Sequence, residues 1–127
     1  MTGRRFGAQR QGRLSDTDEA GRLRLDAVAR YLQAVAADDV ADAGFRPEDH
    51  VWVVRRTWIA QSTPCGADEN VELQTWCSGI ASAAAARRYS LTGDRGGRLE
   101  AESIWIHLDR DLRPLRHGER FLAVSGT

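Results

Sequence analysis

One stretch of the sequence alternates apolar and polar residues with the period of an α-helix. Between Ser15 and Gly44 the apolar residues recur at spacings of three and four, and charged residues fill the opposite face. The apolar set is Leu25, Val28, Leu32, Val35, Ala36, Val40 and Ala43. Gly44 can take the left-handed conformation that ends a helix. The pattern predicts one long helix over residues 23–43, which at about 1.5 Å per residue can lie across a sheet.

The rest of the chain has the alternation and the β-branched and aromatic residues of strands. Residues 81–91 contain enough alanine for a helix, but their alternating end, ARRYSL, favours a strand, and the TGDRGG turn predicts a hairpin with the strand that follows. We expect the apolar first half of the second strand to be buried on both faces. The predicted strands are 5–14, 51–60, 70–77, 81–91 and 99–109.

This order of elements predicts an α+β fold with the helix on one face of an antiparallel sheet. A single helix cannot cover both faces, so we expect the other face or an edge to pair with a second copy, as a homodimer or tetramer. The 127 residues fit a single domain, with residues 1–4 and 118–127 expected to be frayed.

Charge and composition exclude several classes of function. The 18 basic and 18 acidic residues balance, which gives no reason to expect a nucleic-acid partner. No apolar run approaches the length of a membrane span, and the N-terminus lacks the apolar core of a signal peptide. We therefore expect a cytoplasmic protein without a membrane partner.

The cysteines and histidines do not form a recognisable site. Cys65 and Cys77 lack metal-ligand spacing, and we expect both to be free thiols. His50, His107 and His117 lack the spacing of a helical zinc site, and we interpret His107 as structural. We expect no metal and no cofactor.

These segments together resemble a known family. A long central helix wrapped by an antiparallel sheet, in a chain of this length, is similar to the hotdog fold of acyl-thioester enzymes, and specifically to the fatty acyl-ACP thioesterases. The resemblance covers residues 13–116 and rests on LQAVAADDVADAG in the helix and on VWVVRR, LQTWCSG, ARRYSL and ESIWIHLDRDLRPLR in the strands. It implies a hotdog fold with one long central helix wrapped by a five- to six-stranded antiparallel sheet.

The catalytic pattern of that family is only partly present. Its plant-type members contain two hotdog repeats, and this chain resembles the first, whereas their Asp-x-Asn-x-His pattern precedes the long helix of the second. Only Asp18 matches it, because Ala20 and Arg22 replace the amide and the imidazole. The DTDEAG segment, Asp16–Gly21, instead resembles the Asp-x-Asp-x-Ala-Gly turn of single-repeat thioesterases of the 4-hydroxybenzoyl-CoA type, whose second Asp is catalytic. That match also falls on Asp18.

The resemblance makes Asp18, Gly21 and Arg22 the predicted catalytic residues. Asp18 is expected to act as general base or nucleophile. Gly21, without a Cβ, would let a thioester approach an N–H group at the helix N-terminus, which would bind the oxyanion. Arg22 would position the carboxylate or contact the phosphopantetheine. The alternative is that Asp16 and Asp18 are simple helix caps, worth about 1 kcal/mol each, and we keep that interpretation for Asp16.

An acyl chain would need an apolar groove between the helix and the sheet, for which Tyr31, Leu32 and Val35 are candidates. Trp76 lies on the otherwise polar face of its strand and is predicted to line that groove or an interface. A basic rim would steer an acidic acyl carrier protein, although exposed arginines are usually only solvated. The predicted carrier or phosphopantetheine contacts are Arg55, Arg56, Arg87 and Arg88.

The predicted function is that of a thioester hydrolase of fatty acid biosynthesis and lipid metabolism, releasing a fatty or polyketide-like acid from acyl-ACP or acyl-CoA. The main alternative is a non-catalytic, acyl-binding or structural half of a larger thioesterase. A hotdog dehydratase is a further alternative, for which His50 is the only candidate histidine.

Overall fold

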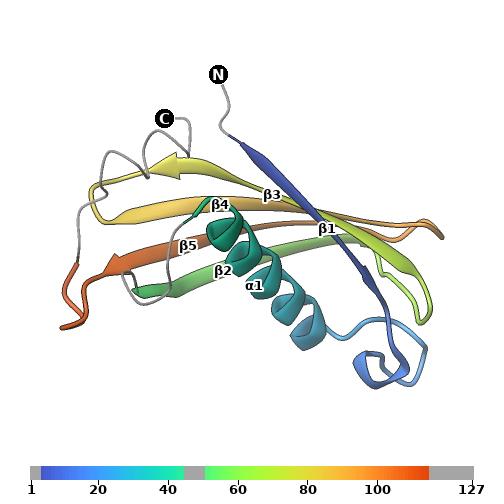
Figure 1. Cartoon of the computed structure of the whole chain (residues 1–127). Helices are drawn as coiled ribbons and strands as arrows, with labels where there is room; N and C mark the ends of the chain where they lie inside the picture. The colour runs from blue at the N-terminus through green and yellow to red at the C-terminus, as the bar shows by residue number, and fades with distance from the viewer. Residues whose placement is uncertain (1–3, 45–50, 115–127) are drawn as a thin grey trace.

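The described part of the chain forms one antiparallel sheet with a single long helix against one of its faces (Figure 1). The computed structural model describes residues 4–44 and 51–114. The helix is α1 (Leu25–Asp42), preceded by the 3-10 turn η1 (Leu14–Asp16). The strands are β1 (Arg5–Gln11), β2 (Val51–Thr63), β3 (Asn70–Ile80), β4 (Ala84–Gly93) and β5 (Arg98–Leu108). The strand order is β1-β3-β4-β5-β2, so β1 and β2 are the edges of the sheet.

The predicted strand pattern is confirmed. Residues 84–93 form a strand and not a helix, and β4 and β5 make the hairpin that the TGDRGG turn predicted. We call the sheet face that carries α1 the inner face, and the opposite one the outer face. On β3, Val71, Leu73 and Thr75 are buried on the inner face, as their alternation predicted.

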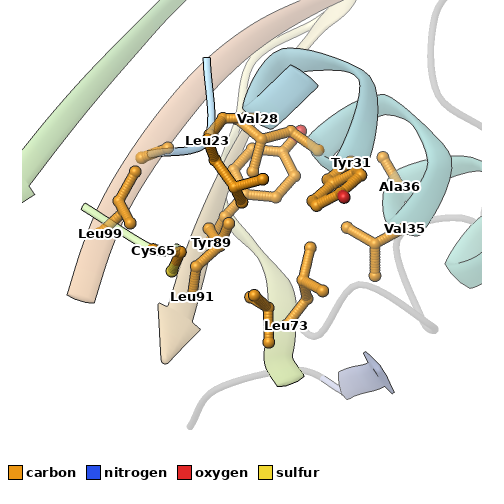
Figure 2. Packing of buried hydrophobic residues seen from close by; sticks show 13 residues of the cluster. Leu23, Val28, Tyr31, Val35, Ala36, Cys65, Leu73, Tyr89, Leu91 and Leu99 are labelled. Atoms are coloured by element: carbon orange, nitrogen blue, oxygen red, sulfur yellow. The ribbon is translucent and has the colours of Figure 1, made fainter. Parts of the chain in front are cut away.

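The apolar stripe of α1 packs on the inner face to form the core. Figure 2 shows the labelled side chains of the helix facing those of β3, β4 and β5. The helical residues are Val28, Tyr31, Leu32, Val35 and Ala36, and the sheet residues are Val71, Leu73, Tyr89, Leu91, Leu99 and Ala101. Leu23 and Cys65 complete the cluster at the end of the sheet that carries the turn before α1. His107 is buried and stacks on Trp52 with ring centroids 4.3 Å apart, which confirms its structural interpretation.

Several predicted boundaries are wrong. The first strand ends at Gln11 and not at residue 14, because Leu14 begins η1, and the fourth strand begins at Ala84 and not at residue 81. The helix begins at Leu25 and not at residue 23, because the Leu23 N–H donates to the carbonyl of Cys65 and Leu23 bridges Thr17 as extended backbone. Arg4 is not frayed, because its guanidinium contacts Asp39 and Asp42 at the far end of α1. Residues 1–3 and 118–127, whose fraying was predicted, lie outside the described residues, as do His50 and His117.

Strand β2 is not buried on both faces as predicted. It is an edge strand, and α1 packs chiefly against β1 and β3 at the opposite side of the sheet. Val53 and Trp58 are 45% and 48% exposed on the outer face. An apolar strand in this position is typical of a surface that pairs with another chain or domain.

Candidate active site

The acidic turn, Asp16–Gly21, lies at the end of the sheet where β2 joins β3 (Figure 1). It is a tight reversal closed by two backbone hydrogen bonds, from Asp18 N–H to the Arg22 carbonyl at 2.8 Å and from Gly21 N–H to the Asp18 carbonyl at 3.0 Å. The Asp18 carboxylate reinforces it, since Oδ1 accepts the N–H groups of Ala20 and Arg22 at 2.9 and 3.0 Å. The turn therefore fixes the position of the Asp18 side chain.

The second carboxylate oxygen of Asp18 remains partly accessible. Its side chain is 35% exposed, and Oδ2 lies 3.3 Å from Nε of Arg22. The pKa of Asp18 is below its usual value, mainly because the carboxylate accepts a hydrogen bond from the backbone N–H of Arg22. The positive charge of the Arg22 guanidinium lowers the pKa further. Asp18 is thus ionised at neutral pH, with the Arg22 guanidinium beside its second oxygen.

The structure contradicts the predicted geometry of Gly21. Its N–H is not at the helix N-terminus, because α1 begins four residues later, and it already donates to the Asp18 carbonyl. Gly21 has a φ of +77°, which a glycine adopts without strain. Apart from Gly21 itself and its two chain neighbours, no described atom lies within 4 Å of where a Cβ would stand. The glycine therefore leaves its face of the turn open beside Asp18.

Asp16 does not cap the helix as predicted, since Arg24 occupies the N-cap position. Its buried carboxylate instead accepts hydrogen bonds from Arg30 Nη2 at 2.7 Å and from Tyr31 Oη at 2.9 Å. The pKa of Asp16 is lowered most by the hydrogen bond from Arg30, and next by the hydrogen bond from Tyr31. Burial and the adjacent carboxylate raise the pKa of Tyr31 to about 12. Asp16 thus anchors the acidic turn to the first half of α1.

Sequence reasoning missed Glu69, which holds the other side of the turn. This carboxylate is only 3% exposed. Its Oε1 accepts the N–H of Gly66 at 2.7 Å, and its Oε2 accepts those of Arg95 and Gly97 at 3.0 and 2.9 Å. Burial alone would raise the pKa of Glu69, but these three donors outweigh it and leave the pKa below its usual value.

The loop that Glu69 organises, residues 65–69, binds the acidic turn through backbone groups. Leu23 N–H donates to the Cys65 carbonyl at 2.8 Å, and Ala67 N–H donates to the Gly21 carbonyl at 2.9 Å. A Cβ at Gly97 would stand 2.5 Å from the Cys65 sulfur, and one at Gly93 would overlap the Glu69 carboxylate. Gly93 and Gly97 of the TGDRGG turn are the sequence feature that could have indicated this contact, because a side chain at either position would collide with it.

The predicted substrate-binding residues do not lie together. Tyr31, Leu32 and Val35 are buried on the inner face, where they form part of the core. Trp76 lies on the outer face, with the Arg5 guanidinium 4.2 Å from its ring centroid. Since alternate residues of β3 point to opposite faces, Trp76 cannot share one groove with the three helical residues within this chain. It stays a candidate for an interface on the outer face.

The predicted arginine rim is also divided between the faces. Arg87 is not at the surface, because its Nη1 contacts Asp39 at 2.7 Å on the inner face, where Asp39 is buried although it was predicted on the solvated side of the helix. Arg88 is exposed and lies 3.3 Å from Glu102. Arg55 and Arg56 are exposed on β2. Three of the four predicted arginines are therefore accessible.

The sequence is similar to a known family and to a mycobacterial protein. Residues 3–118 match the family model described as acyl-ACP thioesterase N-terminal domain. The chain is 36% identical over 114 residues to an uncharacterized protein of Mycobacterium tuberculosis, covering 89% of this chain and 46% of that protein. It spans about half the length of the curated relatives it matches.

The structure is similar to solved thioesterases. A variant of 4-hydroxybenzoyl-CoA thioesterase complexed with 4-hydroxybenzoyl-CoA has a TM-score of 0.88 at 15% identity, over 97% of this chain and 99% of that one. An acyl-ACP thioesterase from Bacteroides thetaiotaomicron has a TM-score of 0.81 at 21% identity, over 90% of this chain and 50% of that one. At these identities the likeness concerns the fold, and it confirms the predicted hotdog architecture.

Among the described residues, no helix is long and apolar enough to cross a membrane.

Proposed function

Because the chain belongs to the family of acyl-ACP thioesterase N-terminal domains, we propose that it is a thioester hydrolase, acting on acyl-ACP or acyl-CoA with Asp18 as its catalytic carboxylate. The observation that carries this proposal is the geometry of the acidic turn. A carboxylate is fixed by two backbone N–H groups, kept ionised, and left accessible through one oxygen beside the open face of a glycine.

The chemistry follows from Oδ2 of Asp18, the oxygen that the backbone of the turn does not bind. It can take a proton from a water molecule that attacks the thioester carbonyl. It can also attack the carbonyl itself, which breaks the carbon–sulfur bond, releases the thiolate and leaves a mixed anhydride that water then hydrolyses. In both routes the carbonyl oxygen gains negative charge. The Arg22 guanidinium, exposed beside Asp18, is the cation that can stabilise this charge.

The carrier of the acyl group would meet exposed basic residues. Arg55 and Arg56 lie on the edge strand β2, and Arg88 lies on the outer face of β4. An acidic acyl carrier protein is attracted to such a surface at low salt. Arg87 is not part of this surface, because its charge is paired with Asp39 inside the fold.

The exposed apolar edge supports assembly through β2. Pairing of β2 with the β2 of a second copy, or with a second hotdog domain of a longer chain, would satisfy the backbone groups of this edge, next to the exposed Val53 and Trp58. This chain covers about half the length of the curated relatives, which is compatible with either a second copy or a second domain. We therefore infer a homodimer or a two-domain equivalent. A role in fatty acid biosynthesis in the cytoplasm is part of the proposal and is supported by the family to which the chain belongs.

A non-catalytic half of a larger thioesterase is the second candidate. Two observations favour it: Ala20 and Arg22 stand where the family pattern has an amide and an imidazole, and Oδ1 of Asp18 is fully used by the turn itself. The dehydratase alternative depends on His50, which lies outside the described residues.

Thiol release from a panel of acyl-CoA and acyl-ACP thioesters of increasing length separates the two candidates. Turnover by the purified protein, with a preference for one carrier, supports the hydrolase. Binding of acyl-ACP without release of thiol from any substrate would contradict the hydrolase and support the structural half.

A further inference from the structure

The acidic turn is joined to α1 at its first residue, Asp16. The Asp16 carbonyl accepts the N–H of Arg24, the N-cap residue, at 2.9 Å. The Asp16 carboxylate, in a residue that is only 7% exposed, accepts hydrogen bonds from Arg30 Nη2 at 2.7 Å and from Tyr31 Oη at 2.9 Å. Both the main chain and the side chain of Asp16 are therefore held by the helix.

Two short antiparallel arms connect this contact to Asp18. The first arm is residues 16–18 and the second is residues 22–24. Thr17 forms an antiparallel bridge with Leu23, and the Asp18 N–H donates to the Arg22 carbonyl at 2.8 Å. The first arm thus carries the proposed catalytic carboxylate, and the second carries the guanidinium beside it.

The two arms are attached to different parts of the fold. The second arm is bound to the loop of residues 65–69, since Leu23 N–H donates to the Cys65 carbonyl at 2.8 Å. The first arm is bound to α1 through the buried carboxylate of Asp16. The position of Asp18 relative to Arg22 therefore depends on where the side chain of Asp16 is held.

Of the two side chains that bind Asp16, Tyr31 is the one with a fixed position. Tyr31 is 8% exposed and belongs to the core, where Figure 2 shows it among the side chains of the helix and sheet. The Arg30 side chain is 59% exposed, and a long exposed side chain can follow a carboxylate that moves. The Tyr31 hydroxyl therefore defines the position of the Asp16 carboxylate, and Arg30 supplies the charge.

The first arm has further contacts that do not depend on Tyr31. Arg24 Nη1 donates to the carbonyls of Ser15 and Thr17 at 2.8 and 3.2 Å, from a side chain that is 41% exposed. Loss of the Tyr31 hydroxyl would leave these bonds in place. The turn should therefore stay folded, while the first arm becomes free to shift against the second.

We propose that Asp16 and Tyr31 are positioning residues for the hydrolysis, and that their hydrogen bond sets where the Asp18 carboxylate stands relative to Arg22 and the thioester. The inference rests on the proposed thioesterase function. Both residues act only through Asp18 and exchange no proton with the substrate. A displacement on the order of 1 Å can lower the rate of a reaction about 100-fold, so a single hydrogen bond at the base of the turn can affect turnover.

The first test measures kcat and KM for dodecanoyl-CoA in Tyr31→Phe. Its kcat should fall about tenfold, with little change in KM, because the substrate still binds but the carboxylate is misplaced. Tyr89→Phe is the matched control, since it removes another buried tyrosine hydroxyl, whose partners are Ser103 and Trp105 on β5. An unchanged kcat in Tyr31→Phe, or an equal fall in Tyr89→Phe, would overturn the proposal.

A double variant distinguishes positioning from a general loss of stability. In the Asp18→Asn background the carboxylate that Tyr31 positions is already absent. Adding Tyr31→Phe should then leave the residual rate unchanged, although the same substitution lowers kcat about tenfold in the wild type. An equal fall in both backgrounds would show that Tyr31 does not act through Asp18.

A titration of Asp18 separates this inference from the hydrolase function. The pKa of Asp18 is low because its carboxylate accepts the backbone N–H groups of Arg22 and Ala20, so a shifted first arm should raise it. Carbon-13 NMR of the Asp18 carboxyl should show this rise in Tyr31→Phe but not in Tyr89→Phe. If the protein hydrolyses no thioester, such a rise still supports the positioning of Asp18 although the hydrolase proposal fails. The same pKa in both variants would refute the positioning role.

Discussion

Glu69→Gln is the substitution for which the structure gives the clearest quantitative expectation. A glutamine keeps the shape of the side chain but replaces one carboxylate oxygen by an NH2 group. In either amide orientation at least one of the N–H groups of Gly66, Arg95 and Gly97 then faces another donor. The remaining hydrogen bonds also lose their charged acceptor. The loss in free energy of unfolding should be about 3 kcal/mol, or roughly 10 °C in Tm for a chain of this size.

The same substitution has a defined pH dependence. The folded-state pKa of Glu69 lies below its usual value of 4.5, so its contribution is complete above the unfolded-state pKa and is lost as pH falls through the folded-state pKa. The difference in unfolding free energy between wild type and Glu69→Gln should be constant above about pH 5.5 and shrink below about pH 4. Other carboxylates titrate in both proteins and cancel in this difference.

Urea unfolding followed by circular dichroism, at several pH values from 3 to 7, measures this difference. Glu100→Gln is the matched control, because Glu100 is exposed on β5 and should change stability by less than about 0.5 kcal/mol. A Glu69→Gln protein as stable as the control at pH 7, or a deficit that persists unchanged at pH 3, would refute the role assigned to Glu69.

Two further substitutions test the contacts at either end of α1. Arg87→Met should lower the free energy of unfolding by about 3 kcal/mol, because it leaves the buried Asp39 with fewer charged partners. In urea unfolding, the double variant Arg87→Met/Asp39→Leu should lose less stability than Arg87→Met alone. Additive losses in the double variant would contradict a direct pair. Tyr31→Phe should cost about 1.5 kcal/mol by removing one donor from the buried Asp16 carboxylate, as measured by thermal unfolding at pH 7, and an unchanged Tm would show that Arg30 alone satisfies it.

The elements of the fold follow from local periodicity and could be predicted. The apolar spacing of α1 and the alternation of β3 and β5 identify the buried side of each segment without knowledge of its neighbours. The decision for a strand in β4 also needed only the alternation of Arg87, Tyr89 and Leu91. What periodicity does not contain is the order of strands in the sheet. Val53 therefore looked like a core residue, although β2 is an edge strand.

The charged residues of the fold were harder to interpret, because their partners are distant in sequence. Arg87 and Asp39 are 48 positions apart, and each alone resembles a solvated surface residue. Glu69 follows a loop and belongs to no periodic segment, so its burial could not be predicted from alternation. Only Gly93 and Gly97 mark where its carboxylate approaches the hairpin. At the acidic turn the resemblance identified Asp18, whereas only the coordinates show that the Gly21 N–H is already used.

The central claim, that the Asp18 carboxylate performs the hydrolysis, is tested most directly by the turnover of Asp18→Asn. Asparagine keeps an oxygen that can accept the N–H groups of Ala20 and Arg22, so the turn should persist while the base or nucleophile is lost. We predict a fall in kcat of about 1,000-fold, with an unchanged melting curve, while Asp26→Asn, an exposed carboxylate in the first turn of α1, stays near wild type. Turnover by Asp18→Asn equal to that of Asp26→Asn would contradict the assignment.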